Sequence, residues 1–197
     1  RICDASQVTD GAVGVILASK AYTERYIAAR GGDATGVSKI EGWGHRTATM
    51  SFAEKMEESA TAPYVLPHTR RAIMDAFKRA DIEDVWAVDV IETHDCFTTS
   101  EYMAIDHFGL TDPGESWKAI EDGTIDFGGR LPINPSGGLI GAGHPVGATG
   151  VRQLLDAHRQ VTGSAGAYQV EGAKRAATLN LGGSGTTSAA FVVGRAG

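Results

Sequence analysis

The sequence predicts an α/β fold in which strands and helices alternate, with functional groups where strands end and helices begin. Three observations carry this prediction. Short apolar runs bounded by glycine, aspartate or serine have the length and composition of buried strands. The segments between them have apolar residues at helical spacing, and glycine-rich stretches stand at several junctions. The expected order is β–α–β–α–β–α–β–β.

The first half of the chain predicts two strands and two helices. Gly11–Ser19 is an apolar run between Asp-Gly and Ser-Lys, which is typical of a buried strand. Residues 21–30 predict a helix that ends at two glycines, and Thr35–Ala48 predicts a strand from its glycine, valine and threonine content. Pro67–Ala80 predicts a helix, with proline in its first turn.

The second half predicts two more helices and three strands. These are the strand Asp84–Asp95, the helices Thr99–Phe108 and Gly150–Val161, and the strands Lys174–Gly183 and Thr186–Arg195. Gly109 and Gly163 end the two helices. Residues 110–133 show no regular pattern.

Composition excludes several classes of protein. The 197 residues are 42% hydrophobic and 21% charged, as in an ordinary globular chain. The formal net charge of −6, without a Lys/Arg cluster, argues against nucleic-acid binding. Two cysteines, Cys3 and Cys96, give no disulfide framework or zinc spacing, and so predict an intracellular protein. No apolar run approaches the roughly 18 residues of a membrane span.

The stretch THDCFTTSE, Thr93–Glu101, follows directly on a predicted strand. Its His94, Asp95 and Cys96 can each move protons or act as nucleophiles. On an extended backbone, His94 and Cys96 point the same way and Asp95 the opposite way. A cysteine at the start of a helix also has its thiolate favoured by the helix dipole. A buried cysteine beside a structural histidine is the alternative interpretation.

The stretch GGLIGAGHPVGATG, Gly137–Gly150, has glycine at six of fourteen positions, and His144 is its one titratable side chain. Its spacing is not a dinucleotide fingerprint. It leads into a helix, with Pro145 near the first turn, so that backbone N–H groups can face a ligand. The glycines would let that ligand come close to His144. A glycine-rich turn with an incidental histidine is the alternative.

A third stretch, LNLGGSGTTS, turns sharply through Gly182, Gly183 and Gly185 and exposes further N–H groups, unless it is simply a tight β-turn. A metal site from His94, Cys96 and His144 lacks any ligand pair of standard spacing. No G-x-S-x-G motif supports a serine hydrolase.

Taken together and in this order, HDCF, NPSGGLIGAGHPVGATG and the terminal NLGG resemble the C-terminal half of a thiolase of the sterol-carrier-protein-2 type. The resemblance runs from SQVTDGAVGVILAS to the end of the chain, and QVEGAK also matches that branch. It implies a thiolase-like layered α/β fold. Residues 1–33 would be the end of the N-terminal domain, with its last strand, and residues 34–197 a C-terminal βαβαβαββ domain.

The resemblance also implies an acyl-CoA C-acyltransferase that works through a cysteine acyl-enzyme. His144 matches the histidine that activates the nucleophilic cysteine, and His94 should face the oxyanion. Cys96 matches the acid/base cysteine of this branch, in agreement with Asn180-Leu181-Gly182 where other thiolases have Cys-x-Gly. Gly182 would supply an N–H to a second oxyanion hole. Substrate contacts are expected from Phe97, Asn134, Ser136, Gly137 and Gly143.

Nothing in the chain matches the surroundings of the family's nucleophilic cysteine, and Cys3 is expected to be a structural thiol. We therefore expect the nucleophile and most of the CoA nucleotide site to lie upstream, in a longer polypeptide. The expected substrates are acyl-CoA and coenzyme A, with no permanent cofactor or metal, and the expected setting is a cytoplasmic homodimer or homotetramer. A thiolase-fold carbon–carbon lyase and a non-catalytic acyl-CoA or lipid-binding protein stay open. Retention of both histidines and Cys96 weighs against the lyase.

Overall fold

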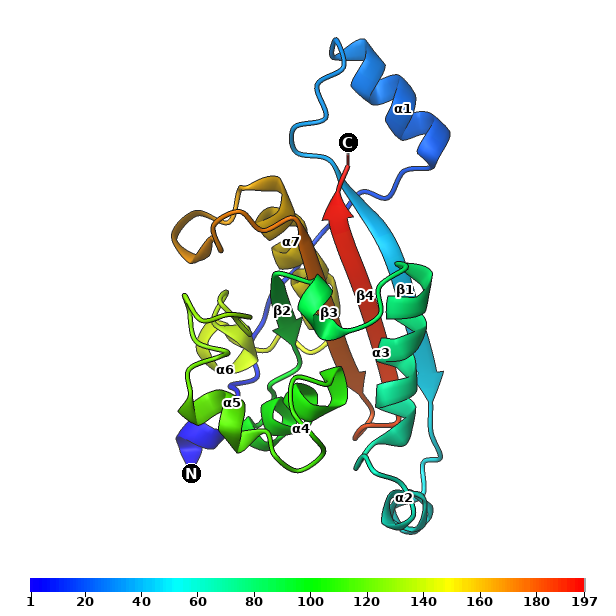
Figure 1. Cartoon of the computed structure of the whole chain (residues 1–197), viewed down its shortest axis with the longest axis vertical. Helices are drawn as coiled ribbons and strands as arrows, with labels where there is room; N and C mark the ends of the chain where they lie inside the picture. The colour runs from blue at the N-terminus through cyan, green and yellow to red at the C-terminus, as the bar shows by residue number, and fades with distance from the viewer. Residues whose placement is uncertain (197) are drawn as a thin grey trace.

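A four-stranded sheet in the order β1-β4-β3-β2 runs through the centre of the molecule (Figure 1). The structure is a computed structural model and describes residues 1–196. The two pairs β1–β4 and β4–β3 are antiparallel, whereas β3–β2 is parallel. The strands are β1 (Ser38–Thr47), β2 (Val90–Thr93), β3 (Arg175–Gly182) and β4 (Thr187–Arg195).

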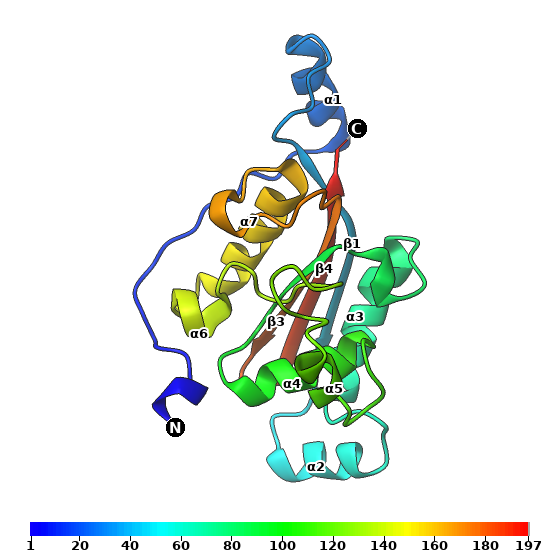
Figure 2. The same ribbon diagram turned by 60° about the vertical axis from the view of Figure 1, so that its left-hand side comes forward.

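Helices cover both faces of this sheet (Figure 2). Helix α3 (Pro67–Arg79) packs on β1 and β4, and α7 (Thr149–Thr162) packs on β2, β3 and β4 from the other side. Neighbouring strand residues accordingly enter different cores: Val192 faces the α3 side and Val193 the α7 side. This alternation is the period of two that a sheet covered on both faces requires.

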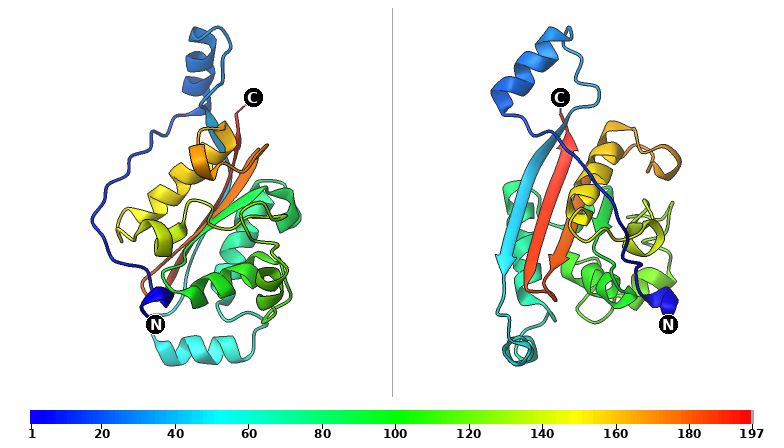
Figure 3. Two further views of the ribbon diagram at one scale, coloured as in Figure 1. Left: turned by 90° about the vertical axis from the view of Figure 1, so that its left-hand side faces the viewer. Right: turned by 180° about the vertical axis from the view of Figure 1, so that it is seen from behind.

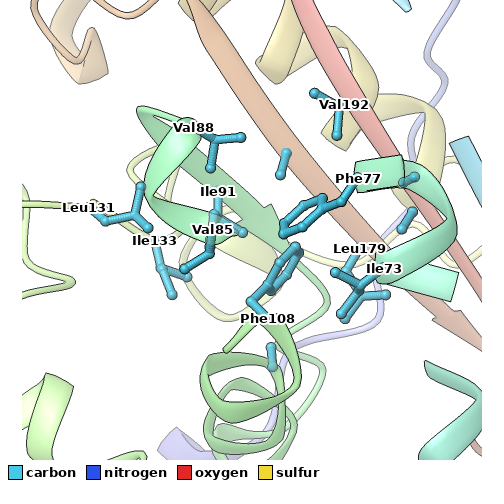
Figure 4. Close-up of a cluster of buried hydrophobic side chains, with 14 of the residues drawn as sticks. Ile73, Phe77, Val85, Val88, Ile91, Phe108, Leu131, Ile133, Leu179 and Val192 are labelled. Carbon is cyan, nitrogen blue, oxygen red and sulfur yellow. The ribbon is translucent and has the colours of Figure 1, made fainter. Parts of the chain in front are cut away.

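The larger core lies between the sheet, α3 and α4 (Thr98–Phe108) (Figure 4). Phe77 and Phe108 meet there with their ring centroids 6.2 Å apart. Gly109 ends α4 in the left-handed conformation, as its position in the sequence predicts. This core fixes α4, so that the start of the helix is held at the end of β2.

Helix α3 lies unusually close to β1. A Cβ atom on Gly42 or Gly44 would overlap the backbone carbonyl oxygens of Ala76 and Ala72, respectively. The two glycines therefore let the helix backbone rest directly on the strand.

The remaining helices are short or stand at the margins. They are α1 (Lys20–Ala29), α2 (Phe52–Ala60), α5 (Trp117–Glu121) and α6 (Gly138–Ala142), with 3-10 turns at Ile2–Asp4, Val85–Ala87 and Gly166–Tyr168. The sequence did not predict α2, α5 or α6, and β2 is shorter than expected because a 3-10 turn replaces its beginning.

The α/β class, the helices α1, α3, α4 and α7, and the strands β1, β3 and β4 are confirmed. The strand expected at Gly11–Ser19 is wrong. These residues form no strand in the structure, and Ile16 is 96% exposed. With consecutive helices taken together, the order within residues 1–196 is thus βαβαββ after α1. An apolar run becomes a strand only where another strand pairs with it, and residues 10–19 run past the sheet instead (Figure 3).

Within the part of the chain that the structure describes, no helix is long and apolar enough to cross a membrane.

Candidate active site

The three glycine- and histidine-bearing stretches meet where β2 ends, beside the last residues of β3. The parallel register pairs Thr93 with Leu179, so the next residues along the two strands, His94 and Asn180, become neighbours. The amide nitrogen of Asn180 lies 3.1 Å from His94 Nδ1 and donates to Gln153 Oε1 at 3.1 Å. Because an amide N–H can only donate, His94 Nδ1 accepts, and the ring proton is on Nε2.

His94 and His144 face each other edge to face, with ring centroids 5.2 Å apart and planes at 88°. Both side chains are buried. Burial, with a smaller effect of the neighbouring His144, lowers the pKa of His94 to about 4. The imidazole of His94 is therefore neutral at pH 7 and offers its Nε2–H as a hydrogen-bond donor.

His144 has the opposite tautomer to that of His94, with its ring proton on Nδ1. Its Nδ1 lies 2.7 Å from the hydroxyl of Thr149, and that hydroxyl donates to the carbonyl oxygen of Pro145 at 3.2 Å. Since the hydroxyl has one proton, His144 Nδ1–H is the donor and Nε2 keeps its lone pair. Burial and the positive charge of Arg152 lower the pKa of His144, against the opposing effect of Asp95. His144 Nε2 is thus available as a base near neutral pH.

Cys96 lies between the end of β2 and the start of α4. The residue is partly exposed, and its sulfur is 3.5 Å from Ser100 Oγ in the first turn of the helix. Phe97, the residue that precedes α4, is 55% exposed. Cys3 is also a free thiol and is exposed in this structure, and a structural role for it stays a prediction.

The N-terminal segment Ala5–Thr9 joins the two histidine-bearing loops. Ser6 N–H donates to the carbonyl oxygen of Cys96 at 2.9 Å. On the other side, His144 N–H donates to Gln7 O at 2.9 Å, and Thr9 N–H donates to His144 O at 3.3 Å. This extended segment therefore runs between Cys96 and His144 and fixes both backbones.

The glycine run forms the wall next to His144. Gly137, Gly138 and Gly143 all have positive φ, which side-chain-bearing residues rarely adopt. A Cβ on Gly138 would overlap the Asp95 carboxylate, and one on Gly143 would meet the Thr9 side chain at 3.0 Å. At these positions glycine is thus required by the close approach of two other segments of the chain. Helix α7 begins at Thr149, four residues after Pro145.

The side chains of Asn134 and Ser136 bond to the buried strand β2. Asn134 Oδ1 accepts from Thr93 N–H at 2.7 Å. Ser136 Oγ donates to Glu92 at 2.6 Å, and burial raises the pKa of Glu92 to about 8. These bonds hold the loop before α6 in place, and a direct contact of either side chain with substrate stays a prediction.

Gly182 ends β3, and open space surrounds the position of a Cβ there. Two side chains hold the turn that follows. Lys55 donates to Ser184 O and Thr186 Oγ1, and His68 Nε2 lies 2.6 Å from Gly185 O. The turn is thereby tied to α2 and α3.

Sequence reasoning missed three residues that contact the two histidines or Asn180, namely Gln7, Thr149 and Gln153. It named Asp95 but did not predict that Asp95 binds the backbone of α6. Thr149 follows His144 by five residues at the start of a predicted helix, which is the one signal that could have pointed to it. Within residues 1–196, no three His, Cys, Asp or Glu side chains are grouped so that they could hold a metal ion.

Comparison with known proteins shows the family to which the chain belongs. The family model for the thiolase C-terminal domain matches residues 51–195. An acetyl-CoA acetyltransferase of Methanothermobacter thermautotrophicus is 33% identical over 99% of this chain and 48% of its own length. Sterol carrier protein 2 of Homo sapiens is 36% identical over 88% of this chain and 30% of its own length.

The fold is also shared with a solved structure, an Ltp2-ChsH2(DUF35) aldolase, with a TM-score of 0.66 and 20% identity over 80% of this chain and 39% of that one. The chain spans about half the length of the acetyltransferase and less of the other two proteins. The family model matches most of the chain, and the acetyltransferase is similar to nearly all of it. Both matches indicate the same family. This chain belongs to the thiolase family and carries its C-terminal domain.

Proposed function

We propose that this chain forms the C-terminal part of the active site of an acyl-CoA C-acyltransferase of the thiolase type. The observation that carries the proposal is the pair of neutral imidazoles, in which His144 Nε2 has a free lone pair and His94 Nε2 has a proton. One ring can take a proton while the other stabilises an oxyanion. Residues 1–33 would belong to the N-terminal domain and residues 34–197 to the C-terminal one.

In the proposed reaction, the nucleophile is a cysteine outside these 197 residues, as the family resemblance implies. His144 Nε2 takes the proton of that thiol, and the thiolate attacks the acyl-CoA carbonyl to form an acyl-enzyme. The CoA thiolate leaves and takes this proton from His144 to become CoA. A groove of about 540 Å³ begins at Pro145, the residue after His144, and is lined by residues 8–13 on one side and by residues 145–148 and 151 on the other. It would leave room for the part of the protein that carries the nucleophile.

In the second half-reaction, Cys96 acts as a thiolate and takes the α-proton of a second acyl-CoA, and the resulting carbanion attacks the acyl-enzyme carbonyl. The bond between that carbonyl and the nucleophilic sulfur then breaks, and the released thiolate takes the proton from Cys96, which restores both groups. His94 Nε2–H donates to the thioester oxygen while negative charge develops on it. Asn180 cannot serve as the acid/base, because an amide does not titrate near neutral pH. Gly182 N–H is proposed as a donor to the second oxyanion hole, with substrate contacts from Phe97, Gly137 and Gly143. Assembly into dimers or tetramers stays a prediction.

A paired measurement on the complete protein tests the proposal. Cys96→Ala should still form an acyl-enzyme with acetyl-CoA, detected by intact-protein mass, but should lose thiolysis of a 3-ketoacyl-CoA by about 10² to 10⁴-fold. Cys3→Ala, which removes the other thiol of this chain, should keep both activities. Normal turnover by Cys96→Ala would remove Cys96 from the mechanism. Absence of any acylation in the wild type would refute the acyltransferase.

The likeness to the aldolase favours one other candidate, a carbon–carbon lyase acting on CoA esters, since that solved structure shares the fold. Such an enzyme needs no acyl-enzyme. The same mass measurement separates the two, because a lyase would cleave its substrate without gaining the mass of an acyl group.

A further inference from the structure

Asp95 stands between two residues of the proposed chemistry, His94 and Cys96, but it has no part in the steps above. Its carboxylate is buried, and it accepts hydrogen bonds from Leu139 N–H at 2.6 Å and from Ile140 N–H at 3.4 Å. Both donors lie in α6, within the glycine run. The side chain of Asp95, next to His94, thus holds the backbone of the glycine run that carries His144.

The fit between the two loops is close. Gly138 has a φ of 57°, and any side chain there would overlap the Asp95 carboxylate. Glycine at 138 is therefore matched to aspartate at 95. Burial raises the pKa of the Asp95 carboxyl, against the opposing effect of the two N–H groups and Arg152.

Arg152 of α7 holds the same short helix from the other side. Its guanidinium donates to Gly138 O at 2.7 Å and to Gly143 O at 2.8 Å. The bond to Gly143 fixes the residue directly before His144. With five residues, α6 has little helical stability of its own, so its position depends on these two side chains.

We infer that Asp95 is the positioning residue that couples the loop of His94 and Cys96 to the glycine run and so sets the spacing of the two histidines. The inference rests on the proposed function for its consequence in catalysis, but its structural part can be tested separately. Asp95 acts on the reacting atoms through its hydrogen bonds to α6 and through its chain neighbours His94 and Cys96, and its charge also opposes the lowering of the pKa of His144.

The test compares Asp95→Asn with Asp106→Asn in the complete protein. Asn has the size of Asp, but its NH₂ group would face one of the two N–H donors of α6. Asp106 is an equally buried carboxylate that also accepts a backbone N–H, from Gly114 at 3.1 Å, but it lies at the far end of α4. Both substitutions remove a buried charge, and only one of them touches the candidate site.

Two readouts distinguish positioning from general stability. Thiolysis by Asp95→Asn should fall about 10²-fold in kcat with little change in KM, as expected for a displacement of about 1 Å. In an NMR titration, the pKa of His94 should rise towards 6.5, because its ring is less enclosed when the loops separate. Asp106→Asn should change neither. Equal effects of the two variants, or no effect of Asp95→Asn on either readout, would overturn the inference.

If Asp95→Asn does not fold, Gly138→Ala tests the same contact from the other partner. The added methyl group would overlap the carboxylate and should lower kcat strongly, whereas Gly141→Ala in the same helix, where an added Cβ meets open space, should not. Equal effects of the two variants would refute the contact. Should the wild type show no thiolysis while the His94 titration still responds to Asp95→Asn, the proposed function fails and the positioning role stands.

Discussion

Thr149→Val should disable His144 while leaving its ring in the protein. Thr149 is fully buried, and its hydroxyl accepts from His144 Nδ1–H at 2.7 Å. Valine has nearly the same shape, so the change replaces one oxygen by a methyl group. The ring then loses the bond that fixes both its orientation and its tautomer.

The size of the effect follows from the geometry. A methyl carbon needs about 3.5 Å from a ring atom, so the imidazole must move by about 0.8 Å from its present 2.7 Å contact. A displacement of about 1 Å at a reacting group can cost about 10²-fold in rate. Leaving His144 Nδ1–H buried without an acceptor should also lower the free energy of unfolding by about 1 to 3 kcal/mol.

Thr149→Ser is the matched control, because it keeps the hydroxyl and loses the methyl group. It should lower the free energy of unfolding by about 1 kcal/mol and leave the chemistry intact. The assay on the complete protein is the rate of alkylation of the nucleophilic cysteine by iodoacetamide, together with kcat for thiolysis. If Thr149→Val keeps both rates, or if Thr149→Ser loses them equally, the hydroxyl does not orient His144.

Two further predictions concern stability. Because the folded pKa of His94 is about 4, the folded state binds fewer protons than the unfolded state between pH 4 and 6.5, so His94 makes stability fall as the pH drops through this range. In denaturant titrations between pH 7 and pH 4, the free energy of unfolding of the wild type should fall by about 3 kcal/mol more than that of His94→Asn. If the free energies of both proteins fall in parallel with pH, the prediction is contradicted. Separately, Gly44→Ala should lower the free energy of unfolding by at least about 1 to 3 kcal/mol, since its methyl would overlap the backbone of Ala72. An unchanged denaturation midpoint would show that α3 can shift away from β1.

Local sequence patterns predicted the elements whose residues carry their own signal. Helices α3 and α7 have apolar residues at helical spacing, and Gly109 marks the end of α4. Helix α2 was missed because none of its residues is buried, so its sequence carries no pattern of core-facing apolar residues. Helix α6 was missed because it has only five residues, and two glycines and an isoleucine among them are weak helix formers. Tertiary bonds from Asp95 and Arg152 hold α6 instead.

The candidate site was predicted only in part for a similar reason. His94, Cys96 and His144 stand out by residue type next to glycines and strand ends. The contact of His94 with Asn180 joins residues 86 positions apart and depends on the parallel register of β2 and β3. The tautomers of the two histidines depend on Thr149 and Asn180, whose partners no local pattern identifies.

The pairing of Ala5–Thr9 with both Cys96 and His144 bears on how this protein could be recombined with its relatives. A chimaera joined near residue 33 would take these five residues from a foreign parent, and the foreign segment would then set the separation of the two histidine-bearing loops. A junction within the exposed stretch 10–19 does no better, because it also leaves residues 5–9 with the foreign half. Exchangeable modules of this protein should therefore begin before Ala5, even though the sheet itself begins at Ser38.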